Sequence, residues 1–176
     1  MIDLKLNYFE LFELPARFDI DTAELERRYR ELQREVHPDR FAAAPEAERR
    51  ASMQMATQVN EAYRTLKSPL KRAGYLLQLH GVDPQFETNT AMPEEFLIEQ
   101  MSLREAIAEA SQAGDDAALA PIAAKLRTGR EALLAELAAQ LDRQNAWQPA
   151  AATLRQLKFL EKLGEDIEAA RERLES

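Results

Sequence analysis

Two apolar stripes with helical spacing, separated by a proline, most constrain how this chain of 176 residues can fold. In each stripe apolar residues recur at intervals of three and four, the spacing of one face of an α-helix. The stripes are Leu25, Tyr29, Leu32 and Val36 upstream, and Met55, Val59, Ala62 and Leu66 downstream. Pro38 lacks a backbone N–H and disfavours helical geometry at His37, so the first helix must end near Val36. We therefore expect a helical hairpin that displays His37-Pro38-Asp39 at its tip.

The upstream helix has a recognisable beginning and a basic face. Asp21 followed by Glu24 predicts a capping box, in which each side chain satisfies a free backbone amide. The face away from the apolar stripe carries Arg27, Arg30 and Arg34. Such a local patch suits an acidic protein partner more than a phosphate backbone. The alternative interpretation is an ordinary interhelical turn beside a solvated arginine face.

Composition narrows the class of protein. A hydrophobic content of 45% allows a packed core, and only 5 glycines favour helices over a sheet. Because the chain has no cysteine, disulfides, thiol catalysis and thiolate metal sites are excluded. His37 and His80 are the only histidines and lie far apart, which argues against a metal site. With no glycine-rich phosphate loop and no paired carboxylates, we expect neither an enzyme nor a cofactor.

The net charge is concentrated in the second half of the chain. Residues 1–75 contain 13 basic and 13 acidic side chains, whereas residues 76–176 contain 10 and 18. Nucleic acid would be repelled by such an acidic half. No apolar stretch is long enough to cross a membrane, and the first five residues lack a signal-peptide pattern. We expect a cytoplasmic protein whose partners are proteins.

The two halves meet in a structured junction. Ser68-Pro69 ends the second hairpin helix, and a short helix follows as far as Leu79-His80, with Gly81 as its C′ residue. Val82–Met92 then has the composition of a loop. The predicted organisation is a hairpin domain over 1–75, a short helix and connecting loop over 76–92, and a helical bundle over 93–176.

The second half contains three longer helices. Their expected ranges are Pro93 to about Gln112, Leu119–Leu141 with Pro121 in its first turn, and Pro149–Leu174. Short connections between long helices favour an antiparallel three-helix bundle. The predicted fold class is therefore all-α, a helical hairpin followed by this bundle.

The first bundle helix has two apolar faces where a bundle needs one. One face contains Phe96, Leu103, Ile107 and Ala110; the nearly opposite face contains Leu97, Ile98, Met101 and Ala108, with Glu105 among them. Phe159, at the edge of the last helix's stripe, could extend the second face. Periodicity alone leaves two interpretations open: packing at the domain joint, or a site that binds a partner.

The hairpin resembles a J-domain, the module that docks on DnaK-type chaperones and stimulates their ATP hydrolysis. The resemblance is carried by Tyr8–Phe12, the arginine-bearing helix, His37–Arg40 and Asn60–Leu66, and a short helix over Asn7–Leu14, closed by Pro15, completes the domain. It implies that His37, Pro38 and Asp39 engage the chaperone. Arg27, Arg30 and Arg34 would attract and orient it electrostatically.

Almost the whole chain is similar to the HscB co-chaperones, which deliver the iron–sulfur scaffold IscU to the DnaK-like chaperone HscA. The similarity is clearest over residues 68–81, 96–105 and 157–163. It implies a J-domain and a client-binding bundle in an L-shaped arrangement with a rigid joint. The scaffold-binding residues that it implies are Leu97, Ile98, Met101, Glu105 and Phe159.

Three departures and two alternatives accompany this resemblance. Ser102 stands where a glutamate is common, Arg40 replaces a lysine, and the cysteine pairs of some eukaryotic relatives are absent, which favours the bacterial type. One alternative is a J-domain co-chaperone with a different client. The other is a helical adaptor without a chaperone partner.

Overall fold

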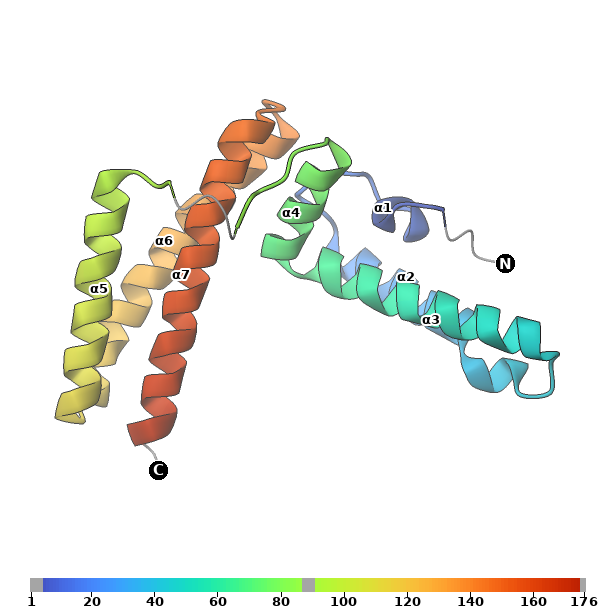
Figure 1. The fold of residues 1–176 in the computed structure, drawn as a ribbon, viewed down its shortest axis with the longest axis horizontal. Helices are drawn as coiled ribbons and strands as arrows, with labels where there is room; N and C mark the ends of the chain where they lie inside the picture. Colours follow the sequence, from blue (N-terminus) through green and yellow to red (C-terminus); the bar gives the residue numbers. More distant parts are fainter. Residues whose placement is uncertain (1–4, 87–90, 175–176) are drawn as a thin grey trace. The chain divides into compact units, whose positions relative to one another are not determined.

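The computed structural model describes residues 5–86 and 91–174, and within them every regular element is a helix, as predicted (Figure 1). The chain forms two compact units, Met1–Leu76 and Leu77–Ser176. Residues 87–90 of the predicted connecting loop lie outside the described residues. The elements are α1 (Tyr8–Leu11), α2 (Thr22–Val36), the 3-10 helix η1 (Pro38–Phe41), α3 (Glu46–Lys67), α4 (Pro69–Leu79), α5 (Glu94–Ala113), α6 (Asp116–Asp142) and α7 (Trp147–Leu174).

The first unit is built on the hairpin of α2 and α3, which lie side by side in Figure 1. The predicted stripes form its core: Leu25, Val36, Val59, Ala62 and Leu66 are buried, and Tyr29 and Leu32 are half-buried. Phe9 and Phe12, from α1 and the residue that ends it, are fully buried. The periodicity of α2 and α3 therefore predicted the inner faces of the hairpin correctly.

Helix α1 is shorter than the predicted Asn7–Leu14. It begins at Tyr8, one residue later than predicted, because Asn7 is the N-cap and forms a capping box with Glu10. It ends at Leu11 because Glu13 adopts a left-handed backbone with φ 53°. The N–H groups of Glu13 and Leu14 then bond to the carbonyls of Glu10 and Phe9, a Schellman motif. The helix is therefore closed by this motif and not by Pro15.

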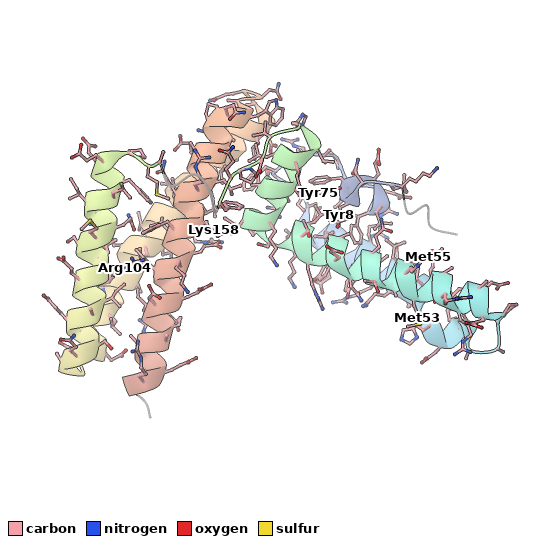
Figure 2. All side chains as sticks on the ribbon, in the orientation of Figure 1. Tyr8, Met53, Met55, Tyr75, Arg104 and Lys158 are labelled. Carbon is pink, nitrogen blue, oxygen red and sulfur yellow. The ribbon has the colours of Figure 1, made fainter. Side chains whose placement is uncertain are left out.

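Two side chains of α4 tie the first unit together. The Tyr75 hydroxyl accepts a 3.0 Å hydrogen bond from the Tyr8 N–H, and the two rings stack with centroids 4.4 Å apart (Figure 2). Arg72 is buried and donates from Nε to the Phe18 carbonyl at 2.7 Å and from Nη1 to the Leu66 carbonyl at 2.6 Å. These two charge-assisted hydrogen bonds compensate the buried cation for the water that it has lost.

The second unit contains the bundle of α5, α6 and α7, which run antiparallel in succession (Figure 1). Helix α6 begins at Asp116, three residues before the predicted start, because Asp115 caps it by accepting from the Ala118 N–H. Pro121 consequently lies in the second turn and not in the first. The buried core is formed by Leu103, Ile107, Ala110, Leu119, Leu126, Leu160, Leu163, Ile167 and Ala170.

The segment before the bundle is held by the end of α4 and by α7. Gly81 is the C′ residue of α4, as predicted, with φ 73°. From α7, Arg155 donates to the Pro84 carbonyl and the Lys158 ammonium lies 4.4 Å from the Phe86 ring centroid. Among the described residues we find no helix with the length and apolarity needed to span a membrane.

Candidate functional site

The histidine–proline–aspartate tripeptide lies between α2 and η1 and is held by its own hydrogen bonds. His37 ends α2 with φ −57° and ψ 126°, the extended geometry that a following proline favours. Its Nδ1 atom accepts a 3.3 Å hydrogen bond from the Asp39 N–H. In the neutral tautomer that accepts this bond, His37 carries its proton on Nε2; the Nδ1 atom also lies 3.5 Å from Oδ2 of Asp39.

The tripeptide is exposed, but the backbone around it is anchored. The side chains of His37 and Asp39 are 58% and 90% exposed. Just before them, the buried Ser52 hydroxyl donates to the Val36 carbonyl at 2.8 Å. Just after them, Arg40 reaches back and donates to the Arg34 carbonyl at 3.1 Å. The structure therefore presents two polar side chains to a partner from a turn fixed on both sides.

The arginine face of α2 is less basic than its sequence suggests. Arg27 pairs with Glu24 and Glu31, and Arg30 pairs with Glu26, all within the same helix. Arg34 donates to the Arg30 carbonyl and has no acidic partner among the residues that the structure describes. The three glutamates were not part of the predicted site, although their spacing of three or four residues from the arginines is a signal that sequence carries. This leaves Arg34 as the arginine of the three most available to a partner.

The capping box predicted for Asp21 and Glu24 at the start of α2 is only half formed. Asp21 does cap α2, accepting from the N–H groups of Ala23 and Glu24. The Glu24 carboxylate instead accepts from Arg27 and Arg28. The hydrogen bond from Arg27, helped by that from Arg28, lowers the pKa of Glu24 from 4.5 to about 2. Arg30 likewise lowers the pKa of Glu26.

A pocket opens beside the tripeptide that the sequence did not reveal. Its volume is about 450 Å³, within the range of ligand-binding pockets. It lies where the end of α2, η1 and the first turns of α3 meet. The lining residues are Glu35, Val36, Phe41, Ala47, Glu48, Ala51, Ser52 and Met55.

The second apolar face of α5 is exposed. Leu97, Ile98 and Met101 are 36%, 60% and 64% exposed, and Glu105 and Ala108 are exposed as well. The opposite face packs into the bundle core through Leu103, Ile107 and Ala110. Within the second unit this apolar face is therefore left uncovered by the bundle core, as a surface that binds a partner would be.

Phe159 on α7 is oriented by side chains of α5. It is half-buried, meets Phe96 edge to face with ring centroids 6.2 Å apart, and lies under the Arg104 guanidinium at 5.3 Å (Figure 2 labels Arg104). Arg104 was not among the predicted site residues. It follows Met101 by three positions, so it lies next to the exposed face along the helix.

The fold and the tripeptide together define a class of protein. The DnaJ domain family matches residues 7–75, which contain α1, the α2–α3 hairpin and the exposed His37-Pro38-Asp39. The first part of the chain is therefore a J-domain.

The remainder identifies the family more narrowly. The HSCB C-terminal oligomerisation domain matches residues 92–168. The chain is 50% identical over 176 residues, covering both sequences fully, to the co-chaperone protein HscB homolog of Burkholderia multivorans. Chaperone HscB from Vibrio cholerae superposes with a TM-score of 0.85 at 41% identity, covering 96% of this chain and 99% of that one. The crystal structure of human co-chaperone protein HscB superposes with a TM-score of 0.89 at 34% identity, covering 96% of this chain and 84% of that one. The chain belongs to the HscB family of J-domain co-chaperones.

Proposed function

We propose that this protein delivers the iron–sulfur scaffold IscU to the DnaK-like chaperone HscA in the cytoplasm and stimulates the chaperone's ATPase, assisting iron–sulfur cluster assembly and transfer. The observation that carries the proposal is that one HscB-family chain exposes both surfaces this task requires. The first unit exposes His37 and Asp39, and the second exposes the apolar face around Met101.

In this proposal the J-domain acts on the chaperone without chemistry of its own. Arg34, and to a smaller degree Arg27 and Arg30, attract an acidic chaperone surface. His37 then offers the Nε2 proton and Asp39 offers carboxylate oxygens, two groups that differ in hydrogen-bonding character. Pro38 holds them at a fixed separation by restricting the backbone. The bond that breaks belongs to ATP on the partner.

The bundle holds the client through apolar burial. Leu97, Ile98 and Met101 form a surface that loses water contact when a client covers it. Glu105 on the same helix and Phe159 at the α5–α7 boundary complete the proposed set. Ser102, next to Met101 in the chain, offers a shorter polar side chain than the glutamate common at this position, so a flanking polar contact with the client is absent.

Calorimetric titration with IscU tests the client. We expect saturable binding by the native protein and at least a tenfold loss of affinity in a Leu97→Ala, Met101→Ala, Phe159→Ala variant. Each fully buried apolar side chain contributes about 1.5–3 kcal/mol, so the combined change exceeds tenfold. Unchanged affinity in a folded variant would place the client site elsewhere, and no binding by the native protein would favour a co-chaperone with another client.

A steady-state ATPase assay with HscA tests the chaperone partner. We expect stimulation by the native protein and its loss in His37→Gln, with helix content and IscU binding retained. Full stimulation by that variant would contradict the role of the tripeptide. No stimulation by the native protein would favour an adaptor without a chaperone partner.

A further inference from the structure

The pocket beside the tripeptide has an interior suited to apolar groups. Of the residues that line it, Val36 and Met55 are buried, and Phe41 and Ala51 are half-buried. The Ser52 hydroxyl, which also lines the pocket, already donates to the Val36 carbonyl at 2.8 Å. Hydrophobic burial is the main interaction that this interior offers.

The exposed side of the pocket is acidic. Glu35 at the end of α2 and Glu48 in the first turn of α3 both line it and are exposed. Within the described residues neither carboxylate forms an ion pair, whereas Glu24, Glu26 and Glu31 on the same hairpin are paired with arginines. Two unpaired carboxylates around an apolar interior favour an occupant with a positive charge beside its apolar group.

The position of the pocket identifies the partner that can reach it. Val36 immediately precedes His37, and Phe41 ends the 3-10 helix that begins at Pro38. A protein that engages the tripeptide must therefore also cover the mouth of the pocket or lie next to it. For a J-domain that protein is an Hsp70-type chaperone.

We infer that the pocket receives an apolar side chain of the Hsp70-type chaperone, one flanked in the chaperone by a lysine or arginine that faces Glu35 and Glu48. This inference rests on the proposed function, since it assumes that the tripeptide engages such a chaperone. It adds a second anchoring point to the exposed tripeptide. Buried anchors in pockets are where binding energy concentrates in protein interfaces.

Filling the pocket tests the inference. In Ala51→Leu the larger side chain occupies the space without adding a polar group or changing the charge. We expect the co-chaperone concentration for half-maximal stimulation of HscA to rise about tenfold, the equivalent of about 1.4 kcal/mol. The matched control is Ala56→Leu, at a half-buried alanine of α3 that does not line the pocket, and it should behave like the native protein. Equal half-maximal concentrations for Ala51→Leu and the native protein would overturn the inference.

Two methionines of α3 provide a second test in the unaltered protein. Met55 lines the pocket, whereas Met53, two residues earlier, is 60% exposed and does not (both labelled in Figure 2). With isotope-labelled methionine methyl groups, addition of ATP-bound HscA should shift the Met55 methyl resonance and leave that of Met53 nearly unchanged. A bound complex in which Met55 does not shift would overturn the inference even if Ala51→Leu failed to fold.

The acidic rim is tested separately. The Glu35→Gln, Glu48→Gln double variant keeps the shape of the pocket and removes both charges. We expect the co-chaperone concentration for half-maximal stimulation of HscA to rise several-fold. That concentration should also depend less on ionic strength, because a charge attraction that salt screens is lost. An unchanged salt dependence would contradict the inference that a lysine or arginine of the chaperone faces these two carboxylates.

Failure of the inference can be told apart from failure of the proposed function. If the native protein does not stimulate HscA at all, the proposed function is wrong and the inference falls with it. If the native protein stimulates and His37→Gln does not, the function stands. Ala51→Leu, the methionine resonances and the rim variant then decide the inference alone.

Discussion

The Nδ1 atom of His37 accepts a hydrogen bond from the backbone N–H of Asp39, so the first residue of the tripeptide caps the turn on which the third stands. One imidazole thereby has two separable roles. Nδ1 stabilises the local backbone, and Nε2 remains available to a partner. A substitution that removes both roles cannot say which one the chaperone needs.

His37→Asn separates the two roles. Asparagine is a good N-cap residue, so its amide oxygen can accept from the Asp39 N–H as Nδ1 does. It is too short to place a donor where Nε2 lies. We expect the free energy of unfolding in urea to change by less than about 0.5 kcal/mol. Stimulation of HscA should nevertheless fall at least as far as in His37→Gln. Full stimulation by His37→Asn would show that the cap is all the chaperone requires of this residue.

The ion pairs of α2 predict an order among its arginines. Arg27 pairs with Glu24 and Glu31, so a partner must compete with two carboxylates for it, whereas Arg34 has no acidic partner among the residues described. Arg34→Ala should therefore raise the co-chaperone concentration for half-maximal stimulation of HscA several-fold, and by more than Arg27→Ala does. The difference should shrink as ionic strength rises. Equal effects of the two variants would mean that docking breaks the intrahelical pairs.

The pKa of Glu24 predicts an acid-dependent loss of stability. The hydrogen bond from Arg27 lowers this pKa from 4.5 to about 2 in the folded protein. When folding lowers the pKa of a carboxyl group, the ionised group stabilises the fold at any pH above its pKa in the unfolded chain. That stabilisation is lost as the pH falls through its pKa in the folded protein. Between these two values the native protein should lose more stability than Glu24→Gln, measured by urea unfolding at each pH. An NMR titration of the Glu24 carboxyl with its midpoint near 4.5 would contradict the ion pair.

Local signals in the sequence were sufficient for the hairpin. The stripe from Leu25 to Val36 and the restriction that Pro38 places on His37 act within a few residues, and the structure confirms both. The errors occur at helix ends. Helix α6 starts at Asp116 because Asp115 caps it, whereas the apolar pattern begins only at Leu119. Caps and apolar stripes are separate signals, and the stripe alone places a boundary too late.

Tertiary features of the sites could not be predicted from the sequence. The pocket beside His37 exists because η1 and the first turns of α3 leave space that Phe41 and Ala51 do not fill, and no pattern encodes unfilled space. Periodicity identified both faces of α5 but not which of them stays exposed. The contact of Arg104 with the Phe159 ring joins residues far apart in sequence. The L-shaped arrangement with a rigid joint stays a prediction.

Exposure separates the proposed scaffold-binding residues into two groups with different consequences for stability. Met101 and Ile98 are 64% and 60% exposed, so Met101→Ala and Ile98→Ala remove little that the fold uses. We expect each to change the free energy of unfolding by less than about 0.5 kcal/mol while weakening IscU binding. Phe159 packs against Phe96 and under Arg104, so Phe159→Ala should also destabilise the bundle.

For this reason Ile98→Ala combined with Met101→Ala is the cleaner test of the client site. Urea unfolding and calorimetric titration with IscU, performed on the same preparations, would measure both effects. The matched control is Met53→Ala, at another exposed methionine but on α3 of the J-domain, which should leave IscU affinity unchanged. If the double variant binds IscU as the native protein does, the exposed face of α5 is not the scaffold-binding surface. In that case the loss in any variant carrying Phe159→Ala would reflect a disturbed bundle.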